Sequence, residues 1–215
     1  NAFVQCNKLT QITIPSSVHT IRTGAFNRCD NIESFVFESP ASLKVLEYGV
    51  VGSKKLKNLT IPASVTDIVA DEWNSALVPV YAAIEVEEGN PNYAAAGGVW
   101  YNKDKTTLIQ VPIPTTSVTL PETLQIIGLK ALYNTEGLTT IDMPASVDSI
   151  GANAFGSGAF TKINIKPSGK LRVIANDAFN NCAALEERIL PATVSFIGDN
   201  AFYDCISLGN IYAYN

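Results

Sequence analysis

The chain has 215 residues, of which 47% are hydrophobic and only 16% are charged, and its net charge is −5 at pH 7. This composition supports a large buried core, and the negative charge argues against a nucleic-acid or anionic-membrane surface, which would need clustered Lys and Arg. Pro, Gly, Ser or Thr interrupts every long apolar stretch before it reaches the roughly 18 residues of a membrane-spanning helix, so we expect no transmembrane segment.

A repeated sequence unit begins in the first residues and continues to the end of the chain. Its clearest copy is 9–29, LTQITIPSSVHTIRTGAFNRC. Each copy predicts a short strand that stops at Pro, a V-x-x-I segment with a second buried edge, and a turn that contains Ala-Phe. The large residue of this turn recurs at Phe3, Phe26, Val51, Trp73, Leu132, Phe155, Phe179 and Phe202.

Repeats of about 20–50 residues indicate a solenoid, because each unit buries its apolar face only against its neighbours. We therefore predict an α/β fold in one domain, residues 1–215: a right-handed leucine-rich-repeat solenoid with a parallel sheet. The Gly-x-x-Ala-Phe segments are predicted to form short helical or 3₁₀ turns.

The repeat is interrupted between Trp73 and Leu132. Alternating Ile84 and Val86 predict one more solenoid strand. The Asn-Lys-Asp-Lys sequence at 102–105 lies between two apolar runs and favours a β-hairpin. We expect residues 98–112 to form this hairpin and to stand off the array, within an insertion of about 87–117.

The unit L-x-x-I-x-I-P-x-S-V-x-x-I-G-x-x-A-F-x-x-C resembles the BspA-type leucine-rich repeat, which is found in surface proteins of gut and oral Bacteroides. The insertion, NPNY followed by GVWYNKDKTTLI, also resembles one that is common in that family. The resemblance implies an extracellular or surface-anchored solenoid that binds proteins or host matrix, and some members are adhesins for fibronectin or fibrinogen. The family has no shared catalytic residues. The chain departs from the pattern at Arg188, where an inward Ile or Leu is expected, so the strand shifts register there or Arg188 pairs with a carboxylate.

The four cysteines occupy one column of the repeat. Cys6, Cys29, Cys182 and Cys205 each follow the column phenylalanine by three residues. We expect buried free thiols, although the spacing of adjacent repeats does not exclude a disulfide. Zinc is disfavoured because there is no CxxC pair and only one histidine, His19.

No catalytic, cofactor or nucleotide-binding motif is present, so we predict a protein that is not an enzyme and has no cofactor. The acidic segment Glu85–Asn90 could offer oxygens to Ca²⁺, but it lacks the ligand spacing of a calcium loop. A solvated acidic turn is the expected reading, and whether a metal binds there is left open.

The outward face of the strands is the predicted protein-binding surface, because it is the broad sheet that a solenoid presents. Its candidate residues are Thr13, Val36, Thr60, Asp142, Asn164 and Tyr212. An alternative is carbohydrate binding or polysaccharide capture, with Tyr93, Trp100 and Tyr101 as a stacking platform, although such aromatics also anchor hairpins. A third alternative is a structural spacer.

Together these features predict a non-enzymatic binding module, extracellular or on a bacterial cell surface, whose signal or anchor sequence is missing from this chain. Its expected partner is a protein, such as one of the host extracellular matrix, and not a nucleic acid. Neither end of the array looks capped, so we expect flanking sequence to cover the ends or copies to associate end to end.

Overall fold

The computed structural model describes residues 2–47, 52–69 and 82–213, and it describes 187–189 and 210–213 by their backbone alone. It consists of two compact units, residues 1–103 and residues 104–215. We call these the N-terminal and C-terminal units, and we call one repeat within either of them a rung.

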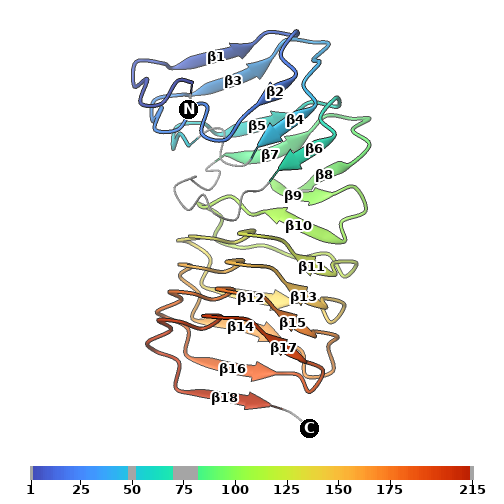
Figure 1. Ribbon diagram of the computed structural model, residues 1–215, viewed down its shortest axis with the longest axis vertical. Coiled ribbons are helices and arrows are strands. Elements are labelled where there is room, and N and C mark those ends of the chain that lie inside the picture. Colours follow the sequence, from blue (N-terminus) through green and yellow to red (C-terminus); the bar gives the residue numbers. More distant parts are fainter. Residues whose placement is uncertain (1, 48–51, 70–81, 214–215) are drawn as a thin grey trace. The chain divides into compact units, whose positions relative to one another are not determined.

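The N-terminal unit contains short strands that pair mainly in parallel (Figure 1). They are β1 Gln11–Ile14, β2 Thr20–Ile21, β3 Ser34–Phe37, β4 Val45–Glu47, β5 Asn58–Ile61, β6 Asp67–Val69, β7 Ala83–Val86, β8 Tyr93–Ala96 and β9 Val99–Asn102. Strand β1 pairs with β3 and β5 with β7, while β2, β4 and β6 form a second sheet. The predicted strand around Ile84 and Val86 is thus confirmed as β7.

The C-terminal unit repeats the same plan. Its strands are β10 Thr107–Gln110, β11 Ile126–Ile127, β12 Thr140–Met143, β13 Ser149–Ile150, β14 Lys162–Ile165, β15 Val173–Ile174, β16 Glu187–Leu190, β17 Phe196–Ile197 and β18 Asn210–Ala213. Strands β12 and β14 lie side by side, as do β13 and β15 (Figure 1). All strand pairs within this unit are parallel among the described residues, which confirms the predicted solenoid with parallel sheets.

Columns of inward side chains make the core. Ile127, Ile150 and Ile174 are register partners on successive rungs, and each is fully buried. They stack because the repeat length returns the same inward position once per rung. The alternation of inward apolar and outward polar residues in the sequence therefore becomes the two faces of each strand.

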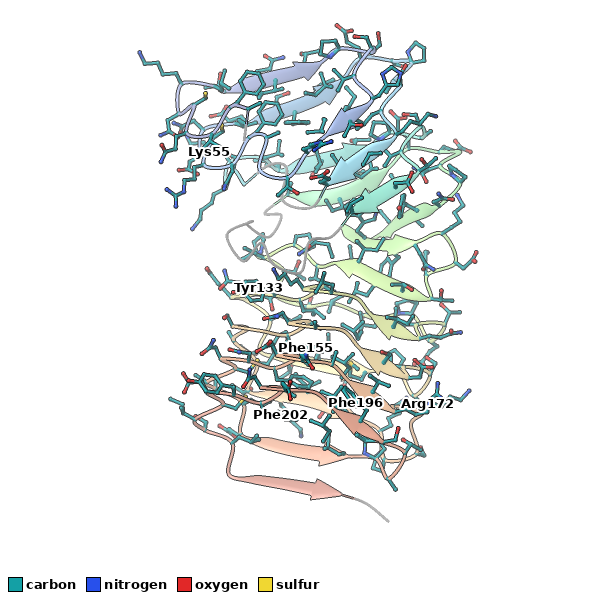
Figure 2. All side chains as sticks on the ribbon, in the orientation of Figure 1. Lys55, Tyr133, Phe155, Arg172, Phe196 and Phe202 are labelled. Carbon is teal, nitrogen blue, oxygen red and sulfur yellow. The ribbon has the colours of Figure 1, made fainter. Side chains whose placement is uncertain are left out.

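A second column consists of aromatic rings. In the C-terminal unit, Phe179 stacks on Phe155 with ring centroids 5.0 Å apart and on Phe202 at 4.9 Å. Figure 2 labels Phe155 and Phe202, which lie along one side of this unit. In the N-terminal unit, Phe3 stacks on Phe26 in the same way at 5.0 Å. The column positions at Val51 and Trp73 lie outside the described residues.

The prediction of helical turns is wrong, because none of the described residues forms a helix. Asn153 and Ser157 flank the Ala-Phe pair of one rung, and both have positive φ, at 52° and 54°. Asp177 and Asn181 do the same on the next rung, at 56° and 58°. A right-handed helix requires negative φ throughout, so two left-handed residues four positions apart end it. Asn and Asp tolerate this conformation better than most residues. Their recurrence beside the Ala-Phe pair is therefore the sequence signal that indicates turns instead of helices.

The turns bond both within themselves and to the next rung. The amide of Phe155 donates to the carbonyl of Ala178 at 2.8 Å, and the amide of Phe179 donates to that of Ala201 at 2.7 Å. Backbone groups that a helix would have paired locally are thus satisfied between rungs. The turns therefore hold successive rungs together as the strands do.

This close stacking predicts a steric requirement for glycine at position 151. A Cβ atom on Gly151 would lie 2.9 Å from the carbonyl carbon of Gly128 and from the oxygen of Ile127. We expect Gly151→Ala to lower the free energy of unfolding by about 1–3 kcal/mol, as overpacked sites do. Gly209→Ala is the matched control in urea denaturation, because its Cβ meets no atom within 4 Å. Equal effects of the two substitutions would contradict the steric argument.

The register is preserved through Arg188, so the first of the two alternatives, a local shift of the strand, does not occur. The amide of Glu186 donates to the carbonyl of Thr161 at 3.2 Å. The equivalent bonds on the flanking rungs join Thr161 to Thr139 at 2.8 Å and Gly209 to Glu186 at 3.1 Å. Arg188 accordingly pairs with Ile211 in the register of β16 and β18. Its side chain lies outside the described residues.

In the insertion, strands β9 and β10 lie on either side of the Asn-Lys-Asp-Lys turn, as predicted, and a further hairpin that the sequence did not indicate precedes that turn. Strand β8 pairs antiparallel with β9, and Gly97 and Gly98 close the turn with φ of 58° and 78°. Two positive φ values are typical of a two-residue hairpin turn, and adjacent glycines supply them most easily. The strands on either side of the Asn-Lys-Asp-Lys turn contain buried residues such as Tyr101 and Leu108, so 98–112 does not stand off the array. No described helix could cross a bilayer.

Candidate functional site

The structure pairs the predicted outward residues across neighbouring strands. Thr13 lies beside Val36, and Asp142 lies beside Asn164. All four side chains are exposed, as an outward position requires. Asn164 Nδ2 donates to Asp142 Oδ1 at 2.7 Å. Sequence alternation thus located this surface correctly, although the partners within it depend on the register of the sheet.

The other two predicted residues are placed differently. Thr60 is half-buried and donates from Oγ1 to Glu85 Oε2 at 3.3 Å, across β5 and β7. Tyr212 pairs through its backbone with Ile189, and its side chain lies outside the described residues.

A groove of about 570 Å³ lies on the outward side of strands β12 and β14. Its lining residues are Thr140, Thr161, Lys162, Ile163, Asn164, Ile165 and Glu186. A smaller hollow of about 130 Å³ is lined by Asp142, the register partner of Asn164, together with Glu122 and Lys166. We call the larger of the two hollows the β12–β14 groove.

The groove offers hydrogen-bonding groups of both kinds. Lys162 supplies a cationic donor, Glu186 an anionic acceptor, and Thr140 a hydroxyl that is both donor and acceptor. Lys162, Asn164 and Glu186 are exposed to solvent. Exposed polar side chains of mixed charge provide orientation and selectivity for a polar partner more than raw affinity.

Thr161 and Glu186 are the groove residues that the sequence did not indicate. Each comes just before a strand, and their backbones bond to each other across adjacent rungs. The alternation rule covers positions within strands, so it could not include them. Their spacing by one repeat length is the only signal that could have found them.

Two of the three proposed glycan-stacking aromatics are interior residues. Trp100 is 4% exposed and Tyr101 is 1% exposed. Tyr93 is half-buried and packs edge-on against Trp100 with ring centroids 5.8 Å apart. A sugar must reach the face of a ring in order to stack on it. The arrangement therefore opposes the glycan platform, and these rings anchor the insertion instead.

Because Tyr101 is buried, the free energy of unfolding should decrease with rising pH in the alkaline range. Desolvation raises the pKa of Tyr101 to about 12, from its usual value near 10. Folding therefore favours the neutral phenol, and this contribution is complete below pH 10 and is lost as pH rises through about 12. Between pH 9 and about pH 11.5, wild type should lose about 1–2 kcal/mol more unfolding free energy than Tyr101→Phe. Parallel pH profiles in urea denaturation would contradict this.

Side chains of the acidic segment Glu85–Asn90 form hydrogen bonds to the preceding rung. Glu87 Oε2 accepts from the amide of Ala63 at 2.8 Å, and Glu85 accepts from Thr60 as described above. Asn90 is buried, and its side chain bonds to backbone groups. Among the described residues no group of three or more His, Cys, Asp or Glu side chains could hold a metal ion.

The predicted cysteine column is confirmed as free thiols, of which all but the half-buried Cys6 are buried. Each buried thiol donates to the carbonyl of the column phenylalanine on the preceding rung: Cys29 to Phe3 at 2.9 Å, Cys182 to Phe155 at 3.0 Å and Cys205 to Phe179 at 3.1 Å. Burial also raises the pKa of Cys29.

Native-state labelling tests this arrangement. Because the thiolate is the reactive form and must reach solvent, we expect iodoacetamide to label Cys6 much faster than Cys182 or Cys205. Peptide mass spectrometry measures each rate separately. Rapid labelling of Cys182 in the folded protein would contradict the buried column.

Comparison with known proteins connects this geometry to a family. The BspA type leucine rich repeat region matches residues 1–75 and 112–215 in six copies. No curated protein is a significant match. The chain is similar to the solved structure of the pneumococcal vaccine antigen PcpA, with 26% identity and a TM-score of 0.84, over 97% of this chain and 51% of that one.

A leucine rich cell surface protein from Faecalibacterium prausnitzii is also similar, at 25% identity and a TM-score of 0.70, over 100% of this chain and 62% of that one. A leucine-rich repeat protein from Eubacterium ventriosum shares the fold, at 24% identity and a TM-score of 0.59, over 99% and 56% of the two chains. The chain thus spans between half and two thirds of these structures. Because the family match covers most of its residues, the chain belongs to the BspA-type leucine-rich repeat family.

Proposed function

We propose that this chain is a non-enzymatic protein-binding module of a bacterial surface protein and that the β12–β14 groove is its binding surface. The observation that carries the proposal is the groove itself, which has a volume of about 570 Å³ and is lined by exposed polar side chains of both charges as well as by Ile163 and Ile165. Such a surface suits a partner that presents its own hydrogen-bonding and charged groups.

The surface location rests on the family and on relatives described as a cell surface protein and as a vaccine antigen. Host extracellular matrix is the finer proposal for the partner, because the family resemblance implies adhesion to fibronectin or fibrinogen. Protein recognition is favoured over carbohydrate binding by the burial of Trp100 and Tyr101.

The test is biolayer interferometry of the 215-residue chain against immobilised fibronectin and fibrinogen, with a glycan array in parallel. We expect saturable binding to one of the two proteins. The double substitution Lys162→Glu with Asn164→Ala should weaken it at least tenfold, because it reverses one charge and removes one amide from the groove.

Tyr203→Ser is the matched control, since Tyr203 is 60% exposed and lies in a turn rather than on a strand. Its binding should equal that of the wild type. Binding that survives the groove substitutions would refute the assigned surface. Binding to glycans alone would favour polysaccharide capture, and silence in both assays would favour a spacer and reject matrix adhesion.

A further inference from the structure

The segment Asn90–Tyr93 lies along the edge of the β2–β4–β6 sheet, where β6 is the last strand. Between the rungs of β4 and β6, the carbonyl of Lys44 accepts from the amides of Thr66 and Asp67 at 3.0 and 3.1 Å. The equivalent carbonyl at the edge, that of Thr66, accepts from Asn92 Nδ2 at 2.8 Å and from the hydroxyl of Tyr93 at 3.2 Å. Two side chains thus replace the two amides of a following rung.

Three further backbone groups of this rung also bond to side chains of this segment. The amide of Ile68 donates to the hydroxyl of Tyr93 at 3.0 Å. The side chain of Asn90 donates to the carbonyls of Pro62 and Val65 at 3.0 and 3.1 Å. An open sheet edge presents unpaired backbone groups that another strand would otherwise cover. Here side chains from the same unit cover them.

We propose that Asn90–Tyr93 is an internal cap that closes the edge of the β2–β4–β6 sheet and makes the N-terminal unit a separately unfolding module. Rungs of a solenoid depend on one another through their interfaces, so an array that is capped by its own residues does not require the next array for its stability. This inference is independent of the proposed binding function.

The chain contains separate reporters for its two units. Its two tryptophans, Trp73 and Trp100, both precede residue 104, so intrinsic tryptophan fluorescence reports on the N-terminal unit. Cys182 and Cys205 are buried in the C-terminal unit, so their alkylation reports on its unfolding. Both signals can be read from the full chain during one urea titration.

The deciding variant is Tyr93→Phe, which keeps the ring and removes the hydroxyl. We expect a lower urea midpoint for the fluorescence transition, corresponding to about a tenfold larger equilibrium constant for unfolding of the N-terminal unit. The midpoint for alkylation of Cys182 and Cys205, read by pulse labelling with iodoacetamide and mass spectrometry, should not move. Tyr203→Phe, an exposed residue of the C-terminal unit, is the matched control and should change neither midpoint.

Two results would overturn the proposal. If the alkylation midpoint falls together with the fluorescence midpoint, the chain unfolds as one cooperative array and the cap does not separate two modules. If neither midpoint moves in Tyr93→Phe, the hydroxyl does not stabilise the edge.

Discussion

Substituting Phe155 by alanine should lower the free energy of unfolding of the C-terminal unit by about 3–5 kcal/mol. Phe155 is fully buried, stacks on Phe179 and meets Phe160 edge-on with ring centroids 5.2 Å apart. Removing the ring leaves a cavity and deprives both neighbouring rings of contacts. Urea denaturation followed by circular dichroism measures the loss, and hydrogen exchange should show the adjacent rungs opening first.

Phe202→Ala is the control for this prediction. Phe202 belongs to the same column and also stacks on Phe179, but it is only half-buried. Its truncation should cost about 1–2 kcal/mol, because less apolar area is lost from the interior. Equal losses for the two variants would mean that the stability of the column does not depend on burial.

Asn90→Ala should be the most damaging polar substitution in the N-terminal unit, at about 2–4 kcal/mol. Besides the two bonds to Pro62 and Val65, Asn90 Oδ1 accepts from the amides of Asn92 and Tyr93, both at 2.9 Å. Alanine makes none of these four bonds, so the carbonyl of Val65 and the amides of Asn92 and Tyr93 lose their bonds to Asn90. Tryptophan fluorescence in urea is the measurement.

Asn92→Ala provides the comparison, since Asn92 is exposed and its side chain makes a single bond, to Thr66. We expect it to cost about 1 kcal/mol. A loss in Asn90→Ala no larger than the loss in Asn92→Ala would show that the buried amide does not hold this segment to the preceding rung.

Phe155→Ala and Asn90→Ala test two different sources of stability, a repeated interface between rungs and a single local cluster of hydrogen bonds. The aromatic column stabilises the array through an interface that repeats from rung to rung, so any interior member should matter to a similar degree. The Asn90 cluster occurs at one place and closes one sheet edge. A protein-binding surface on β12 and β14 depends on the repeated interface between rungs, because its residues are held in place only by the register of adjacent rungs.

The candidate site was predictable only in part. Asp142 and Asn164 follow from the alternation of inward and outward residues in a strand, which is a local property of the sequence. Thr161 and Glu186 do not, because they enter the groove only when one rung is laid on the next. The burial of Trp100 and Tyr101 was not predictable for a related reason: both residues lie in an irregular insertion, where no period indicates which side is buried.

By itself the sequence determined the repeat, the inward columns, the position of the thiols and the family, because each depends on residue types that return at a constant spacing. Only the tertiary structure decided the form of the turns, the additional hairpin of β8 and β9, and the hydrogen bonds from Asn90–Tyr93 to the preceding rung. In the turns, some backbone amides bond within the turn and others bond to the next rung, and residues with positive φ interrupt any helix there. Such choices depend on partners that are distant in the sequence and adjacent only after folding.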